Sequence, residues 1–159
     1  MRRTSFEDMN CSLAQCLEVV GEWWTLLIVR DALLGVTRFD DFRDRLGIAR
    51  NVLAQRLEHL VAHDILTREP YQDNPVRHDY RLTPKGRSLW LVVTAMRQWG
   101  DDWAAPDGPP LEVVHTTCGH TAVIHPTCSH CGEKVTGPDL RPTLGPGAHS
   151  PALLPVPSH

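Results

Sequence analysis

Residues 38–86 most constrain the fold of this chain, because two helical patterns and a turn-rich stretch follow one another there within fifty residues. An apolar residue recurs at helical spacing at Phe39, Phe42 and Leu46. Gly47 then suits a helix end, and a second helix is expected over residues 50–63. Its predicted inner face consists of Val52, Leu53, Leu57, Leu60 and Val61. Two short helices joined by a tight turn are typical of a helix-turn-helix, whose second helix enters the DNA major groove.

The outer face of this second helix carries side chains suited to reading bases. Arginine pairs with guanine edges, whereas asparagine and glutamine pair with adenine edges. A helical hairpin with a merely solvated polar face is the alternative interpretation. The candidate DNA-contacting residues here are Arg50, Asn51, Gln55, Arg56 and His59, together with Arg38 before the first helix.

A β-hairpin is predicted directly after the two helices. Residues 65–68 begin one strand, residues 80–83 alternate as the returning strand, and residues 70–75 are rich in turn formers. A hairpin in this place corresponds to the wing of a winged helix. Arg77 and His78 are candidates for contact with phosphate or the minor groove, and for Arg77 a solvated loop charge is the alternative.

A long helix is predicted from Thr83 and Pro84, since threonine is a good helix cap and proline suits the first helical position. Its apolar stripe is wide, so part of it is expected to pack against a second copy of the chain. The alternative is that the whole stripe is intramolecular core. The stripe comprises Leu89, Val92, Val93, Met96, Trp99 and Trp103. Two further helices, over residues 13–20 and 23–34, are expected to complete the scaffold.

Three segments, in this order and spacing, resemble the HxlR-type regulators, a winged-helix family near the MarR proteins. They are NCSLAQCLEVVGEWWTLLIVRDALLG (residues 10–35), TRFDDFRDRLGIARNVLAQRLEHL (37–60) and RHDYRLTPKGRSL (77–89). The resemblance covers residues 11–103. It implies a homodimeric transcription factor on a palindromic operator of double-stranded DNA. Repression is the default expectation, because a bound dimer blocks polymerase without further contacts, and activation is the alternative. The sequence does not identify a small-molecule effector.

The same resemblance draws attention to Cys11. Some family members sense oxidants or electrophiles through a cysteine at this position, so Cys11 is the redox candidate of the chain. A thiol near a helix N-terminus is also more reactive when its pKa is lowered. Packing without any sensing role is the alternative, and Cys16, among apolar neighbours, is expected to be inert.

Charge is distributed in a way that suits a DNA-binding segment. The chain of 159 residues has a formal net charge of -3. Residues 36–87, however, hold ten Arg or Lys against eight Asp or Glu, whereas both flanking segments are acidic. Phosphate contact needs a local patch rather than a basic protein. The small excess predicts a shallow salt dependence of binding.

Other functional classes find little support in the sequence. It has no phosphate-binding loop, no GxSxG and no HExxH motif, so an enzyme is not expected. Neither a signal peptide nor a transmembrane helix is expected, which predicts a cytoplasmic protein that is nucleoid-associated when bound to DNA. The five cysteines are then not expected to form structural disulfides. A protein-interaction module that has lost DNA binding is a further alternative.

A pair of short cysteine motifs lies beyond this region. His115 and Cys118 precede one glycine, and Cys128 and Cys131 precede another, each pair separated by two residues as in a zinc knuckle. Four such ligands predict a closed, structural Zn²⁺ site. His120 is an alternative to His115, and reduced cysteines in a loose tail are the alternative to a metal. Residues 121–124 are expected to form a small hairpin.

The sequence therefore predicts a mainly α fold with a small β-hairpin, a winged helix-turn-helix, plus a small C-terminal zinc-ribbon-like β element. Residues 1–105 are expected to form the DNA-binding and dimerisation domain. Residues 106–136 are expected to form the zinc-ribbon-like module. Residues 137–159, rich in proline and glycine, are expected to be a flexible tail.

Overall fold

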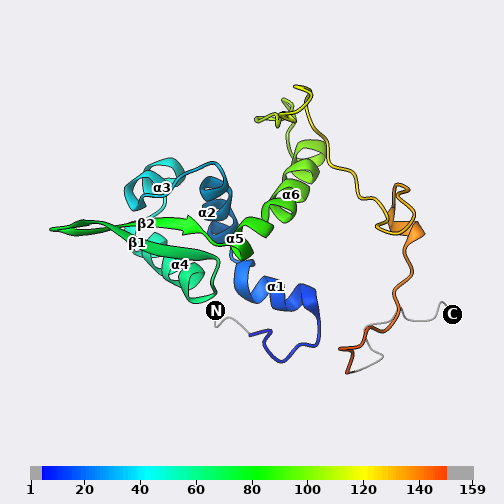
Figure 1. Cartoon of the computed structure of the whole chain (residues 1–159), viewed down its shortest axis with the longest axis horizontal. Helices are drawn as coiled ribbons and strands as arrows, with labels where there is room; N and C mark the ends of the chain where they lie inside the picture. Colours follow the sequence, from blue (N-terminus) through cyan, green and yellow to red (C-terminus); the bar gives the residue numbers. More distant parts are fainter. Residues whose placement is uncertain (1–4, 150–159) are drawn as a thin grey trace. The chain divides into compact units, whose positions relative to one another are not determined.

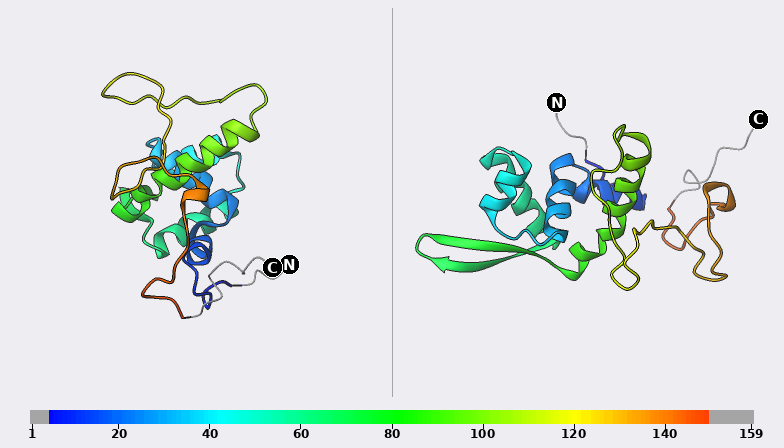
Figure 2. Two further views of the ribbon diagram at one scale, coloured as in Figure 1. Left: turned by 90° about the vertical axis from the view of Figure 1, so that its right-hand side faces the viewer. Right: turned by 90° about the horizontal axis from the view of Figure 1, so that it is seen from above.

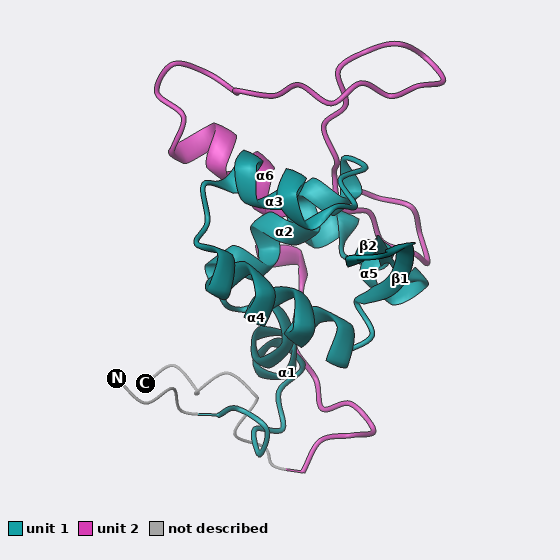
Figure 3. Ribbon diagram, turned by 90° about the vertical axis from the view of Figure 1, so that its left-hand side faces the viewer, with its two compact units in different colours: residues 1–93 teal, residues 94–159 magenta. Residues whose placement is uncertain are grey.

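The computed structural model describes residues 5–149 and divides the chain into two compact units, residues 1–93 and 94–159 (Figure 3). The first unit is mainly helical with one two-stranded antiparallel sheet, as the sequence predicts. Its elements are α1 (Ser12–Val20), α2 (Trp23–Leu33), α3 (Phe39–Leu46), α4 (Arg50–Ala62), β1 (Leu66–Asp73), β2 (Val76–Leu82) and α5 (Pro84–Ser88). The helix α6 (Trp90–Trp103) begins in this unit and continues into the second.

The core of the first unit lies where α2, α3, α4 and the base of the hairpin meet (Figure 2). Phe42 on α3 and Leu57 on α4 are fully buried there, as the helical spacing predicts. The core residues are Ile28, Val29, Phe42, Ile48, Leu53, Leu57, Leu60, Ile65 and Leu66. One charged group is buried beside them: the Asp31 carboxylate lies 2.8 Å from Arg30 Nη2 and 3.4 Å from Arg45 Nε. This network joins α2 to α3.

The turn between α3 and α4 follows from two residues. Gly47 has a φ of +62°, a left-handed conformation that glycine adopts without steric cost, and its N–H closes the end of α3 on Arg43 O. Ile48, 4% exposed, anchors the turn in the core. The second helix then begins at Arg50, as predicted.

The wing is longer than expected. In Figure 1, β1 and β2 project together past α3 and α4 as a narrow hairpin. Their pairing runs from Leu66 opposite Leu82 to Asp73 opposite Val76, with a register shift at Tyr71. The turn predicted over residues 70–75 is therefore wrong in extent. The shift takes up one extra residue, so the strand continues beyond Pro70.

The single long helix expected after Pro84 is instead two helices. Thr83 caps α5 as predicted, accepting the Gly86 N–H at 2.9 Å, but α5 ends at Ser88 and α6 starts at Trp90. The short helix packs closely on the base of the hairpin. A Cβ atom on Gly86 would lie 2.1 Å from Ile65 O, so only glycine fits this contact.

The second unit contains the rest of α6, two tight turns and a short 3₁₀ helix over Gly137–Asp139. The hairpin expected over residues 121–124 is not formed. Instead, isolated bridges join Val114 to Thr121 and Thr127 to Lys134, each around one turn. The predicted tail begins at 137, and residues 150–159 of it lie outside the described part of the chain.

No single helix among residues 5–149 has the length and apolar composition needed to cross a membrane. In the same described part of the chain, one pair of helices, α1 and α2, passes that test together, and this pair is bent by 78°.

Candidate nucleic-acid interface

The N-terminal half of α4 presents three of the predicted base-reading side chains to solvent. Arg50, Asn51 and Gln55 are all exposed, while Leu53 and Leu57 on the opposite face are fully buried. The helix thus has one face fixed in the core and another free for a ligand. This is the division that a recognition helix requires.

A groove separates this end of α4 from the wing. Arg50 approaches it from α4, its guanidinium 5.2 Å from the centre of the Phe39 ring. Arg77 and His78 approach it from β2, Arg77 exposed and His78 half-buried. The residues that line it are Phe39, Asp40, Arg50, Tyr71, Pro75, Val76, Arg77, His78 and Tyr80. Of the predicted DNA-contacting residues, the structure therefore brings Arg50 of the helix and Arg77 and His78 of the wing to one surface.

Arg38 ties α3 to the wing. Its guanidinium carbon lies 4.8 Å from the centre of the Tyr71 ring, and its Nε is 4.0 Å from Asp79 Oδ1. Thr37 supports the same junction, since its carbonyl accepts the Tyr80 N–H and its hydroxyl donates to Asp79 Oδ1. These contacts fix the angle between wing and helices.

Two aromatic residues of this surface were not predicted from the sequence. Tyr71 lies in the stretch expected to be a turn, and helical spacing predicts Phe39 only as part of the apolar stripe of its helix. Their neighbour Tyr80 is partly buried, and this burial raises the pKa of its phenol above the ordinary value. Interleaving of arginine with aromatic residues along 38–80 was the available signal for these contacts.

Arg56 and His59 face away from the groove. His59 Nε2 lies 2.8 Å from Val19 O at the carboxyl end of α1, and its ring centre is 4.1 Å from that of His63. Arg56 Nη1 lies 4.0 Å from Glu22 Oε2, and its Nε is buried without a hydrogen-bond partner. The outer-face position expected of His59 is wrong, because α1 covers that turn of α4.

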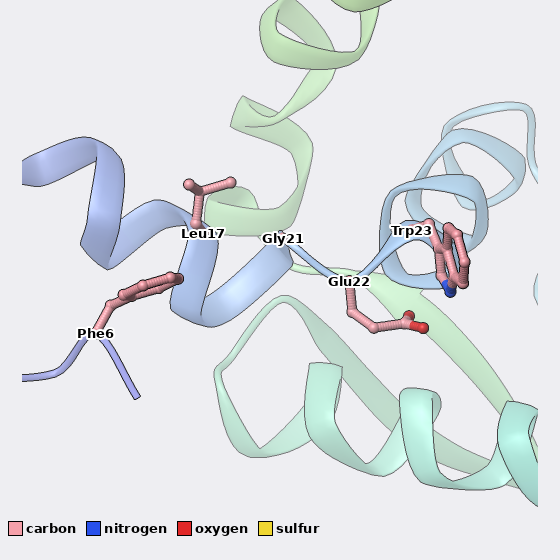
Figure 4. Close-up of a pocket in the computed structure, with 5 residues that line it drawn as sticks. All are labelled: Phe6, Leu17, Gly21, Glu22 and Trp23. Carbon is pink, nitrogen blue, oxygen red and sulfur yellow. The ribbon is translucent and has the colours of Figure 1, made fainter. Parts of the chain in front are cut away.

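Glu22 occupies the corner between α1 and α2. Its Oε2 accepts the backbone N–H groups of Trp24 at 3.0 Å and Thr25 at 3.3 Å, so it caps α2. Figure 4 shows its side chain extending toward α4, with Phe6 and Leu17 on the other side of Gly21. Together with Trp23 these residues line an open groove in the first unit. The sequence offered no sign of this groove.

The predicted cysteine motifs each form a compact turn. In the first, His115 Nδ1 lies 3.3 Å from Cys118 Sγ, and the Gly119 N–H donates to His115 O at 2.8 Å. In the second, the Gly132 N–H donates to Cys128 O at 2.8 Å. Both glycines adopt a positive φ, +71° and +77°. Each turn therefore has the backbone conformation expected of a zinc knuckle.

Electrostatics in the second turn favour a thiolate. The backbone N–H groups of Cys131 and His130 lower the pKa of the Cys128 thiol below its ordinary value, because they donate to its sulfur. Within residues 5–149, however, no three His, Cys, Asp or Glu side chains converge as a metal-binding group. The structure forms the two halves of the predicted site but does not bring them together.

Cys11 stands just before α1 as its N-cap residue, half-buried, in an extended conformation and without a side-chain capping hydrogen bond. Cys16 is also half-buried, within α1 itself. Both thiols are free. The arrangement leaves the redox role of Cys11 as a prediction.

This chain is similar to several proteins described as transcription regulators. The chain is 45% identical over 137 residues to the HTH-type transcriptional regulator Rv3095 of Mycobacterium tuberculosis, covering 86% of this chain and 87% of that protein. The crystal structure of PA1607, described as a transcription factor, matches with a TM-score of 0.79 and 37% identity over 88% of this chain and 99% of that one.

The oxidised form of the redox regulator HypR matches with a TM-score of 0.54 and 32% identity, over 58% of this chain and 96% of HypR. These similarities agree with the expectation of a transcription regulator. The sequence profile of the HxlR-like helix-turn-helix family matches residues 19–108, more than half of the sequence. With its helix-turn-helix and wing in the predicted order, this chain belongs to the HxlR-like helix-turn-helix family of transcription regulators.

Proposed function

We propose that this regulator is a homodimeric repressor that binds a palindromic operator. The observation that carries the proposal is the groove between α4 and the wing, where Arg50 and Arg77 approach one surface from two elements. Arg50, Asn51 and Gln55 read base edges in the major groove, and Arg77 contacts phosphate or the minor groove. A protein with this role acts in the cytoplasm, at the nucleoid.

The dimer is supported by apolar side chains that one protomer leaves exposed. On α6, Trp99 is 65% and Trp103 is 77% exposed, and on α1 Leu13 is 67% exposed. A two-fold dimer buries the same residues from both copies. It also places two recognition helices about one helical turn of DNA apart, roughly 34 Å, which is the reason for a palindromic site.

Repression is the simplest outcome of such binding, because a dimer seated across a promoter excludes polymerase without any further contact. The first experiment is a gel shift with a footprint on the intergenic DNA upstream of the gene. We expect a protected palindrome that the Arg50→Ala/Gln55→Ala protein loses. Arg87→Ala is the matched control, since Arg87 is exposed on α5 and does not line the groove.

A protein that protects no DNA in this assay, or in a genome-wide pull-down, contradicts the proposal and favours a protein-interaction module. The dimer has its own test in sedimentation of Trp99→Glu, which places a charge on the exposed face of α6. We expect wild type to sediment as a dimer and the variant as a monomer at micromolar concentration. A monomeric wild-type protein contradicts the dimer alone.

A thiol-based switch through Cys11 is the second candidate function. It is favoured by the similarity to the redox regulator HypR and by the free, half-buried Cys11 at the start of α1. Diamide is expected to weaken operator binding by wild type and not by Cys11→Ser. An equal response of the two proteins removes Cys11 from the mechanism.

A further inference from the structure

The segment after α6 has no apolar core of its own. Among residues 104–149 none is buried, and Val114 and Val123 are at least half exposed. Within the second unit, the side-chain amide of Gln98 on α6 holds the backbone of Ile124, because its Oε1 accepts the Ile124 N–H at 2.8 Å and its Nε2 donates to Ile124 O at 3.0 Å. A chain of this length with so little burial needs another cross-link to keep one conformation.

The two knuckle turns supply groups for such a cross-link. Each pairs two soft ligands across two intervening residues, closes with a glycine of positive φ, and lies inside its own isolated bridge. The first turn brings an imidazole nitrogen to 3.3 Å from a thiol sulfur. In the second, the Gly132 N–H donates to Cys128 O at 2.8 Å and the Cys128 N–H donates to Glu133 O at 2.8 Å. Two separate turns thus have the same ligand-presenting shape.

We propose that His115, Cys118, Cys128 and Cys131 bind one structural Zn²⁺ that joins the two turns. Three thiolates and one imidazole form a tetrahedral ligand set that favours zinc over harder divalent ions. With all four positions taken by protein ligands, the ion has no position left for a substrate. The thiol protons leave for solvent as the metal binds, so the exchange is balanced without a redox step.

His115 is the fourth ligand because its ring already faces the Cys118 sulfur. The rival His120 turns its Nδ1 to Cys118 O, at 2.8 Å, and holds the backbone of the turn. Nine residues, 119–127, separate the inner cysteines of the two turns. Fully extended they span about 30 Å, which leaves ample chain for the turns to fold back on one ion.

The extension is also a shared feature rather than an isolated tail. The family profile ends at residue 108, whereas the match to the Mycobacterium tuberculosis regulator runs for 137 residues and therefore extends past it. The site is independent of DNA binding. A protein without zinc would not contradict the proposed DNA-binding function. A protein that does not bind the operator would likewise not contradict the proposed metal site.

The test is the zinc content of the untagged, full-length protein after gel filtration. We expect about one zinc per chain. Cys128→Ser/Cys131→Ser is expected to lose it, while Cys16→Ser in α1 is the matched thiol control and is expected to keep it. Wild-type protein that holds no zinc and takes up none from zinc chloride overturns the proposal, as does a double variant that keeps its zinc.

A second measurement separates a lost ligand from a misfolded segment. Co²⁺ in place of zinc gives thiolate-to-metal absorption in the near ultraviolet whose intensity reports the number of bound thiolates. We expect this band to fall by about one third in Cys118→Ser, from three thiolates to two. It is expected to persist in His120→Ala, whereas loss of metal in His120→Ala but not His115→Ala overturns the assignment of His115.

Discussion

Arg77 and Arg81 lie on the same strand, and their different surroundings predict different effects on the salt dependence of DNA binding. Arg77 is exposed, and none of the ion pairs within residues 5–149 includes it. Arg81 is held by two carboxylates, with Nε 3.2 Å from Glu69 Oε2 and Nη2 2.8 Å from Asp79 Oδ2. Only Arg77 is therefore free to replace a phosphate counterion.

A dimer carries two wings, so Arg77→Ala removes two phosphate contacts. Since each contact contributes about 0.9 to the slope of log K against log salt, the slope of the variant is expected to be shallower by about 1.8. The affinity ratio of wild type to variant then falls by about 12-fold between 50 and 200 mM salt. Fluorescence anisotropy on a labelled operator across this range measures the slopes.

Arg81→Ala is the matched control, and we expect its slope to equal that of wild type. A slope unchanged in Arg77→Ala but reduced in Arg81→Ala refutes the reasoning, because it places the phosphate contact on the paired arginine.

Three further predictions concern stability. Glu22→Ala is expected to lower the free energy of unfolding in urea by about 1 kcal/mol, because α2 loses its cap. Glu22→Gln is expected to lower it less, since the amide keeps an acceptor oxygen. Equal losses in the two variants point instead to the charge that faces Arg56. Phe42→Ala is expected to cost about 3–5 kcal/mol, and a loss under 1 kcal/mol contradicts its full burial. Because burial raises the pKa of Tyr80 above 10.0, the folded state favours the neutral phenol. The stabilisation that comes from the neutral Tyr80 phenol is complete below pH 10 and is lost as the pH rises through its raised pKa. The Tyr80→Phe protein is therefore expected to lose less stability than wild type over that rise in pH.

Helical spacing predicted the helix-turn-helix well, because the apolar residues of α3 and α4 report directly on one core. It failed for His59, which lies one turn beyond Gln55 on the same side of α4. The covering group is Val19 O, a carbonyl at the carboxyl end of α1 that α1 itself cannot satisfy. No spacing within α4 encodes a neighbour forty residues away.

The wing and the knuckles show the same limit. Pro70 and several residues after it are turn formers, yet the register shift at Tyr71 lets the strand continue. Such a shift depends on the partner strand, which a local pattern does not report. Local motifs were enough to predict both knuckle turns, since each is closed by its own glycine and bridge. Whether the two turns bind one ion depends on how residues 119–127 fold between them, and neither local motif determines that.

The close contact at Gly86 makes the wing a rigid lever arm. Thr83 donates to Asp64 O at 2.7 Å and Gly86 leaves no space beside Ile65 O, so α5 and the base of the hairpin turn together. Eight residues of β1 at about 3.3 Å each give an arm of about 26 Å. A rotation of α5 by about 5° therefore moves the wing tip by about 2 Å, the scale that makes or breaks a phosphate contact.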